Sequence, residues 1–213
     1  APYRCDRNPD PRRFPAQNSL PTPLAGDRFG IVSFAELLDF VDAYARSPHK
    51  TAAQRLAAER VSFNFETKRV PAHPEYIGDD FDGENPGTFE TRVVDVLRER
   101  GVLARSVLQC FNFRSLWAAQ KLEPALALTA LTERGVPDLA GLAQRGVRCW
   151  SPGEADLSAE AVATAHIHGL TVVAWTVNEV ERMRALVDLG VGGLISDRPD
   201  LLMAVARERW PAR

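Results

Sequence analysis

The sequence predicts an α/β fold, a TIM (β/α)8-type barrel of which about six of the eight β/α units are present in this chain. The first observation is a series of six short apolar runs, each followed by helical periodicity, at spacings of roughly 20 to 40 residues. The second is the absence of a glycine-rich turn that cradles phosphate. An open doubly wound sheet fits the same alternation, and the missing turn favours the barrel.

Two helical segments are expected before the first strand. Residues 1–30 are rich in proline and contain Gly26 and Gly30, which predicts an irregular loop. Ser33 followed by Glu36 has the spacing of a capping box, so a helix is expected to begin at residue 34. Residues 51–59 are rich in alanine and predict a second helix that leads into the first strand.

Strands and helices then alternate to the end of the chain. The predicted strands span 61–68, 106–111, 125–131, 147–150, 170–177 and 191–195. The predicted helices span 86–101, 113–122, 137–144, 158–168, 179–189 and 199–210. The strand over 170–177 is hydrophobic enough to be covered on both faces, as parallel strands are. We expect a single domain over 1–213 that is N-terminally incomplete, with its six β/α units in 61–213.

The composition is that of an ordinary globular protein. The chain has 213 residues, of which 45% are hydrophobic and 25% charged, and a formal net charge of -2. Without a stripe of Lys and Arg, a nucleic-acid partner is not expected, and no run approaches the ~18 apolar residues of a membrane span. Cys5, Cys110 and Cys149 lie too far apart for paired metal-ligand spacing. A periplasmic or secreted location and a cytoplasmic one both stay open.

Two opposite charges lie at the end of the first predicted strand. Glu66 and Lys68 are two residues apart, so they point to the same side of a strand. In a parallel barrel the C-terminal strand ends meet, which brings this pair together with Phe111 and Trp175. A carboxylate binds a hard divalent cation, an ammonium neutralises a phosphate oxygen, and an aromatic face covers an apolar part of a substrate. The alternatives are a surface salt bridge on an edge strand and a purely structural Trp175.

Other polar residues are expected to be structural or solvated. The four histidines are His49, His73, His166 and His168. None follows a predicted strand, where barrel chemistry resides. The segment 69–85 carries Asp79, Asp80, Asp82 and Glu84, whose spacing lacks the regular alternation of a calcium-binding loop. We expect a solvated acidic loop there.

Several runs, in order along the chain, resemble a known family. They are Glu66-Thr-Lys68 after an apolar strand, Leu108 to Asn112, Ala165 to Asn178, and Gly190 to Pro199. With the opening from Tyr3 to Gln17, they resemble the glycerophosphodiester phosphodiesterase family over nearly the whole chain. The resemblance implies a TIM barrel, a divalent cation that is calcium or magnesium, and hydrolysis of glycerophosphodiesters to glycerol 3-phosphate and an alcohol.

The N-terminal catalytic motifs of that family are absent from this sequence. Neither its His-Arg-Gly turn, nor its Glu-x-Asp pair, nor its His-Asp pair occurs. The catalytic residues therefore stay unknown. By the resemblance, Glu66 is a metal ligand, while Lys68, Phe111 and Trp175 contact the substrate. Cys110 replaces a Ser that precedes the Phe in the family.

Two hypotheses of different classes follow. In the first, the chain is the C-terminal part of a metal-dependent phosphodiesterase, inactive alone, whose open strand edges need the missing N-terminal segment or another chain. In the second, it is a non-catalytic phosphodiesterase-like binding or interaction protein. Both take a small-molecule phosphodiester. A Schiff-base enzyme with Lys68 as nucleophile would need a desolvated lysine, which the neighbouring Glu66 opposes.

Overall fold

The structure is a computed structural model that describes residues 33–209 except 71 and 80. The chain divides into two compact units, one of residues 1–62 with 98–100 and the other of residues 63–97 with 101–213. The loop expected over 1–30 lies outside the described residues, as does the resemblance over 3–17. The single domain expected over 1–213 stays a prediction.

The first unit contains the helices α1 (Phe34–Arg46) and α2 (Ala52–Arg60), which pack against each other. The capping box predicted for α1 is confirmed, because the amide of Glu36 donates to Ser33 Oγ at 3.3 Å and its carboxylate accepts from the Ser33 amide at 2.7 Å. Thr51 and Gln54 repeat this arrangement at α2. Each helix therefore begins where a side chain satisfies its free amide groups.

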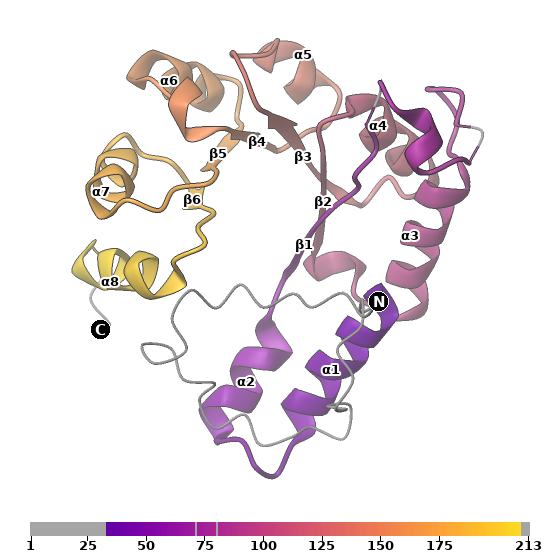
Figure 1. Cartoon of the computed structure of the whole chain (residues 1–213), viewed down its shortest axis with the longest axis horizontal. Coiled ribbons are helices and arrows are strands. Elements are labelled where there is room, and N and C mark those ends of the chain that lie inside the picture. Colours follow the sequence, from indigo (N-terminus) through magenta and orange to yellow (C-terminus); the bar gives the residue numbers. More distant parts are fainter. Residues whose placement is uncertain (1–32, 71, 80, 210–213) are drawn as a thin grey trace. The chain divides into compact units, whose positions relative to one another are not determined.

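The second unit contains a parallel sheet. Within the described residues its strands are β1 (Phe63–Glu66), β2 (Ser106–Cys110), β3 (Ala127–Thr132), β4 (Cys149–Pro152), β5 (Thr171–Ala174) and β6 (Gly193–Leu194). The strands follow one another in chain order, and every neighbouring pair is parallel. Figure 1 shows them along an arc. The prediction of an α/β fold with a partial TIM-type sheet is confirmed.

Helices connect these strands and lie on the convex side of the arc (Figure 1). They are α3 (Thr88–Glu99), α4 (Phe113–Leu122), α5 (Leu139–Gln144), α6 (Ala159–Ile167), α7 (Val180–Asp188) and α8 (Pro199–Arg209). Short 3-10 turns are η1 (Pro74–Tyr76), η2 (Leu103–Arg105) and η3 (Glu154–Asp156). Parallel strands need crossover connections, and the helices of these connections cover the sheet.

Several strands are shorter than the sequence predicts. The first covers Phe63–Glu66 instead of 61–68, and the last covers Gly193–Leu194 instead of 191–195. Apolar residues continue beyond the hydrogen-bonded ladder, so hydrophobicity overestimates strand length. The prediction that the strand over 170–177 is covered on both faces was also wrong. Val172 and Ala174 are fully buried, whereas Thr171 on the other face is exposed.

The two faces of the sheet differ in polarity. The side chains that face the helices include Leu108, Leu128, Trp150 and Val172, which are apolar and at most 1% exposed. The concave face carries more polar side chains, which the parallel register aligns across the strands as Glu66, Gln109, Thr129, Cys149 and Thr171. Because alternate residues of a strand face opposite sides, this register fixes which side chains reach the barrel interior.

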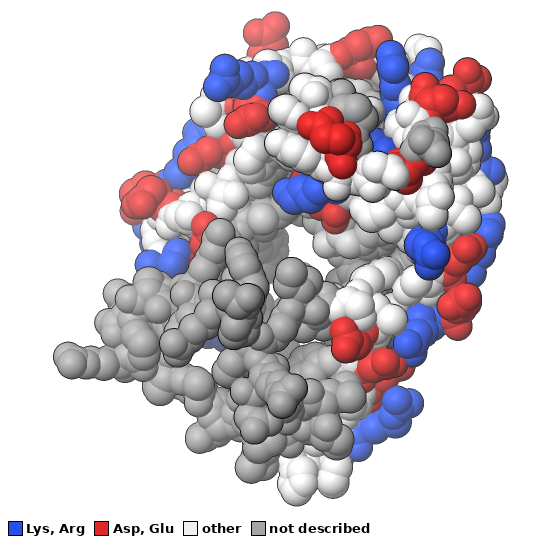
Figure 2. Space-filling model, turned by 45° about the vertical axis from the view of Figure 1, so that its right-hand side comes forward, with Lys and Arg blue, Asp and Glu red and all other residues white. Residues whose placement is uncertain are grey.

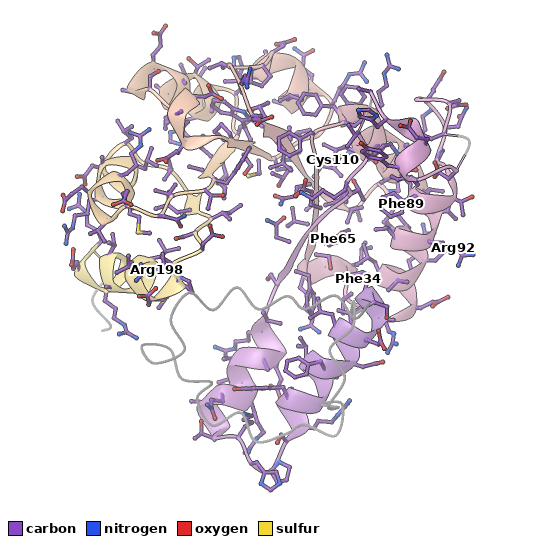
Figure 3. All side chains as sticks on the ribbon, in the orientation of Figure 1. Phe34, Phe65, Phe89, Arg92, Cys110 and Arg198 are labelled. Carbon is purple, nitrogen blue, oxygen red and sulfur yellow. The ribbon has the colours of Figure 1, made fainter. Side chains whose placement is uncertain are left out.

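A buried ion cluster links the end of β1 to α3. Arg69 is 4% exposed and donates to Glu90 through Nε at 2.8 Å and to Asp79 through Nη1 at 2.9 Å and Nη2 at 2.8 Å. Its guanidinium also lies over the ring of Phe89, which Figure 3 labels, and 4.1 Å from the ring centroid of Phe81. Burial acts to lower the pKa of Arg69, but the hydrogen bonds that its guanidinium donates to the two carboxylates outweigh burial and raise that pKa.

The segment 69–85 is therefore not simply a solvated acidic loop. The side chain of Asp79 is 9% exposed, because it pairs with Arg69 and accepts from the Phe89 amide at 3.0 Å. For Asp79 the expectation of solvation was wrong, since its partner is ten residues away and shows no sequence signature. Asp82 is exposed and caps a turn, and hydrogen bonds from Asn85 and Glu84 lower its pKa to about 2. Asp80 lies outside the described residues.

Replacing Arg69 with methionine should destabilise the protein by about 3–5 kcal/mol, because the buried carboxylates of Asp79 and Glu90 lose their counter-charge. The free energy of unfolding from urea titration measures the change. The control is Arg184→Met at an exposed ion pair with Glu208, where a loss of about 1 kcal/mol or less is expected. Equal losses for the two variants would contradict a dominant role for the cluster.

The contribution of the cluster to the free energy of unfolding should also depend on pH in the acidic range. The hydrogen bond from Arg69 lowers the pKa of Asp79 below its usual value of 3.8 in the folded state. Its contribution is then complete above about pH 4 and is lost as pH falls from there through the lower folded-state pKa. Asp79→Asn should flatten the dependence of unfolding free energy on pH below pH ~4. Asp95→Asn, an exposed position on α3, should keep the wild-type slope.

Candidate functional site

A pocket of about 360 Å³ lies at the C-terminal ends of the first three strands. Its lining consists of Glu66, Thr67, Lys68, Arg69, Val70, Phe111 and Glu133. Glu66 is the last residue of β1, Phe111 directly follows β2, and Glu133 directly follows β3. Because the three strands are parallel neighbours, their ends place residues from distant parts of the sequence around one cavity.

Glu66 and Lys68 form an ion pair in this pocket. The Lys68 ammonium lies 2.7 Å from Glu66 Oε1, and the side chains are 76% and 19% exposed, respectively. The approach lacks hydrogen-bond geometry, so this buried oxygen has no hydrogen-bond donor among the described residues. An ion pair with one exposed partner contributes about 0–1 kcal/mol, so exchange of Lys68 to another anion is inexpensive. Glu66 ends β1, an edge strand of the sheet in the described residues, as one alternative supposed, and the pair also lines the cavity.

Phe111 and Trp175 form an aromatic pair next to the charges. Their ring centroids are 5.6 Å apart at an interplanar angle of 87°, an edge-to-face arrangement. The Trp175 indole donates to the Ser151 carbonyl at 2.9 Å, which fixes the orientation of its ring. Phe111 is 41% exposed and lines the pocket, whereas Trp175 contacts Phe111 but does not itself line the pocket. The four residues selected from the sequence therefore form one contiguous group.

Glu133 is a pocket residue that sequence reasoning missed. It is exposed, and the described residues give its carboxylate no hydrogen bond or ion pair. The signal that pointed to Glu66, a charged residue at the C-terminal end of a strand, also applies to Glu133, which directly follows β3. The strand was expected to end at residue 131, whereas β3 continues to Thr132, so Glu133 lies closer to the strand end than the predicted bounds indicated.

Other residues at the strand ends have structural roles. Trp150 is fully buried on the helix side, and its indole donates to Thr132 Oγ1 at 2.9 Å. Asn112 caps α4 by accepting from the amide of Arg114 at 3.2 Å. Cys110 lies on β2, next to the strand that carries Phe65 (Figure 3), and its thiol donates to the Thr67 carbonyl at 3.1 Å. Burial raises the pKa of this thiol.

The described residues do not complete a metal site. No group of three or more His, Cys, Asp or Glu side chains is placed among them to hold a metal ion. Glu66 offers one oxygen-bearing side chain, whereas calcium takes 6–8 oxygen ligands. None of the described histidines lines the pocket. His73 stacks on Tyr76 at 4.7 Å between ring centroids and contacts Glu75, away from the ion pair.

A second cavity of about 380 Å³ adjoins the segment 69–85. Its lining consists of Arg69, Val70, Phe81, Asp82, Gly83, Asn112 and Arg114. The Arg69 guanidinium there is already occupied by Asp79 and Glu90, so it is not available to a ligand. This cavity lacks the carboxylates and the ammonium of the first pocket.

The outer surface mixes the two signs of charge. Figure 2 shows Lys and Arg interspersed with Asp and Glu on the visible face of the described residues. Within the described part of the chain, none of the helices combines the length and the apolar character that crossing a bilayer requires.

Comparison with known proteins identifies the family. The model of the Glycerophosphoryl diester phosphodiesterase family matches residues 41–201, more than half of the chain. A glycerophosphodiester phosphodiesterase of Caldanaerobacter subterraneus is 27% identical over 125 residues, 58% of this chain and 51% of that protein. One of Bacillus subtilis is 24% identical over 182 residues, 79% of this chain and 60% of that protein. The chain thus spans between half and two thirds of the length of these relatives.

Solved structures share the fold. A Silicibacter pomeroyi protein, described provisionally as a glycerophosphoryl diester phosphodiesterase, superposes with a TM-score of 0.64 at 25% identity, covering 83% of this chain and 56% of that one. An Oleispira antarctica phosphodiesterase, solved with the product sn-glycerol 3-phosphate, has a TM-score of 0.58 at 16% identity and covers 78% and 60%. The family predicted from the sequence is confirmed: this chain belongs to the glycerophosphoryl diester phosphodiesterase family.

Proposed function

We propose that this chain forms part of a site that hydrolyses glycerophosphodiesters to glycerol 3-phosphate and an alcohol. Family membership supports this class of reaction. The observation that carries the proposal is the pocket at the C-terminal strand ends, which contains an exposed ammonium beside a half-buried carboxylate. Sites of TIM barrels lie at this end of the strands.

Lys68 is proposed to bind the phosphate group. Its ammonium is 76% exposed and held near the pocket by Glu66, so a phosphate oxygen can accept from it without prior loss of a strong bond. This exposure also argues against a Schiff-base nucleophile, which needs a desolvated lysine. In the hydrolysis, the oxygen of water bonds to phosphorus, the bond from phosphorus to the alcohol oxygen breaks, and that oxygen takes a proton. Phe111 and Trp175 are proposed to contact the substrate beside the phosphate.

Glu66 is proposed as one ligand of a divalent cation, calcium or magnesium. Its Oε1 is buried and is paired with the exposed ammonium of Lys68, which a divalent cation can replace. Such a cation would polarise phosphoryl oxygens. The described residues supply too few ligands to hold it firmly, so the remaining ligands must come from elsewhere. We therefore propose weak cation binding and little turnover by these 213 residues alone.

A non-catalytic binding role is the second candidate. It is favoured by the pocket lining, which contains no histidine among the described residues to move a proton. Loss of a general acid or base typically costs ~10²–10⁴-fold in rate. The two candidates agree on phosphate binding by Lys68 and differ in whether any turnover depends on a cation.

Replacing Lys68 with methionine should weaken binding of sn-glycerol 3-phosphate about tenfold or more, because a charge-assisted hydrogen bond to phosphate is lost. Titration calorimetry on the whole chain measures the dissociation constant. Lys121→Met is the matched control, since this lysine pairs with Glu84 outside the pocket. If Lys68→Met binds as tightly as the control, Lys68 does not contact the phosphate.

Hydrolysis of a glycerophosphodiester by the chain should be slow and stimulated by added calcium or magnesium, and Glu66→Gln should abolish the stimulation because it removes the charged ligand. Release of glycerol 3-phosphate measures turnover, with Glu160→Gln on the exposed side of α6 as control. Turnover insensitive to both cations would refute the metal role. Binding without any turnover in the presence of both would favour the non-catalytic candidate.

A further inference from the structure

Three chemically different groups follow one another along the rim of the pocket. Lys68 lies after β1, Phe111 after β2 and Glu133 after β3, and these strands are successive neighbours in the sheet. An exposed cation, an exposed aromatic ring and an exposed carboxylate therefore line one cavity in that order. The phosphate-binding role proposed above uses the cation and leaves the purpose of the carboxylate open.

We propose that Phe111 and Glu133 select diesters whose alcohol carries a positive charge, with Glu133 as the specificity-determining residue. This inference rests on the proposed function, in which Lys68 binds the phosphate. An ammonium group gains from the face of an aromatic ring and from a nearby carboxylate. The Trp175 indole, edge-to-face with Phe111 at 5.6 Å, supports the ring that the cation would contact. The pocket is thereby complementary to a phosphate and an ammonium in one molecule.

The spacing of the strands fits such a zwitterion. Adjacent strands are about 4.8 Å apart, so the backbone after β1 and that after β3 are separated by about 10 Å across β2. A phosphate near Lys68 and an ammonium two methylene groups away then place the ammonium over Phe111 and toward Glu133. A neutral alcohol of similar size would leave the Glu133 carboxylate without a counter-charge.

The free state of Glu133 is consistent with this role. Among the described residues its carboxylate has no hydrogen bond or ion pair, whereas the other carboxylate of the pocket lining, that of Glu66, pairs with Lys68. A competing role is that Glu133 joins Glu66 as a second ligand of the cation. That role predicts weaker calcium binding when Glu133 loses its charge, and selection of the alcohol does not.

The test compares two diesters that differ in the charge of the alcohol. The dissociation constants of sn-glycero-3-phosphocholine and of glycerophosphoglycerol are measured by titration calorimetry for the wild-type chain and for Glu133→Gln. The wild type should prefer the choline diester, so the dissociation constant of glycerophosphoglycerol divided by that of the choline diester should exceed one. Glu133→Gln should reduce this preference ratio by roughly threefold to tenfold. Glu160→Gln, which removes the same charge from an exposed position on α6, should keep the wild-type ratio. Phe111→Leu, which removes the aromatic ring, should also lower the preference for the choline diester.

The outcomes separate this inference from the proposed function. Equal binding of the two diesters, or a ratio unchanged by Glu133→Gln, would overturn the selection of a charged alcohol while phosphodiester binding stands. Failure of the wild type to bind either diester would overturn both. A calcium titration of Glu133→Gln without diester completes the test, since unchanged calcium affinity supports the inference and weakened affinity assigns Glu133 to the metal.

Discussion

The buried guanidinium of Arg69 is the interaction on which the pocket depends. It joins the end of β1, the segment that contains Asp79 and the first turn of α3 through charge-assisted hydrogen bonds. Ser115 of α4 adds a hydrogen bond to Glu90 at 2.6 Å, so the cluster also reaches the next helix. A buried charge with full pairing holds its neighbours in one arrangement, because displacing any partner leaves another charge unpaired in a low-dielectric site.

This cluster matters for function because of its place in the chain. Arg69 directly follows Lys68, and the two neighbours have opposite environments, one 4% exposed in total and the other with a side chain 76% exposed. Anchoring Arg69 limits the positions that Lys68 and the pair with Glu66 can take. A buried, fully paired support behind an exposed ammonium keeps a binding group oriented without burying it. The stability of the cluster and the geometry of the pocket are therefore coupled.

The parallel register supplies the second constraint. Glu66 lies opposite Gln109, and Gln109 opposite Thr129, so the polar side chains of three strands share the concave face. Apolar side chains such as Leu108 and Leu128 point to the helices instead, where burial of a leucine contributes about 1.5–3 kcal/mol. A shift of one residue in any strand would exchange these faces. The hydrophobic layer thus maintains the alignment of residues that are 40 or more positions apart, such as Glu66 and Gln109.

Local sequence patterns were sufficient to predict much of the architecture. The order of strands and helices, the cap at Ser33, and the pairing of Glu66 with Lys68 depend on residues close in sequence, and the structure contains all of them. The contact of Arg69 with Glu90 and the place of Glu133 in the pocket could not be predicted from the sequence, because they depend on which distant segments the fold brings together. Alternation along a strand and capping along a helix act over a few residues, so the amino-acid order alone decides them. Contacts between residues distant in sequence depend instead on where the strand ends meet, and packing of the whole sheet determines that.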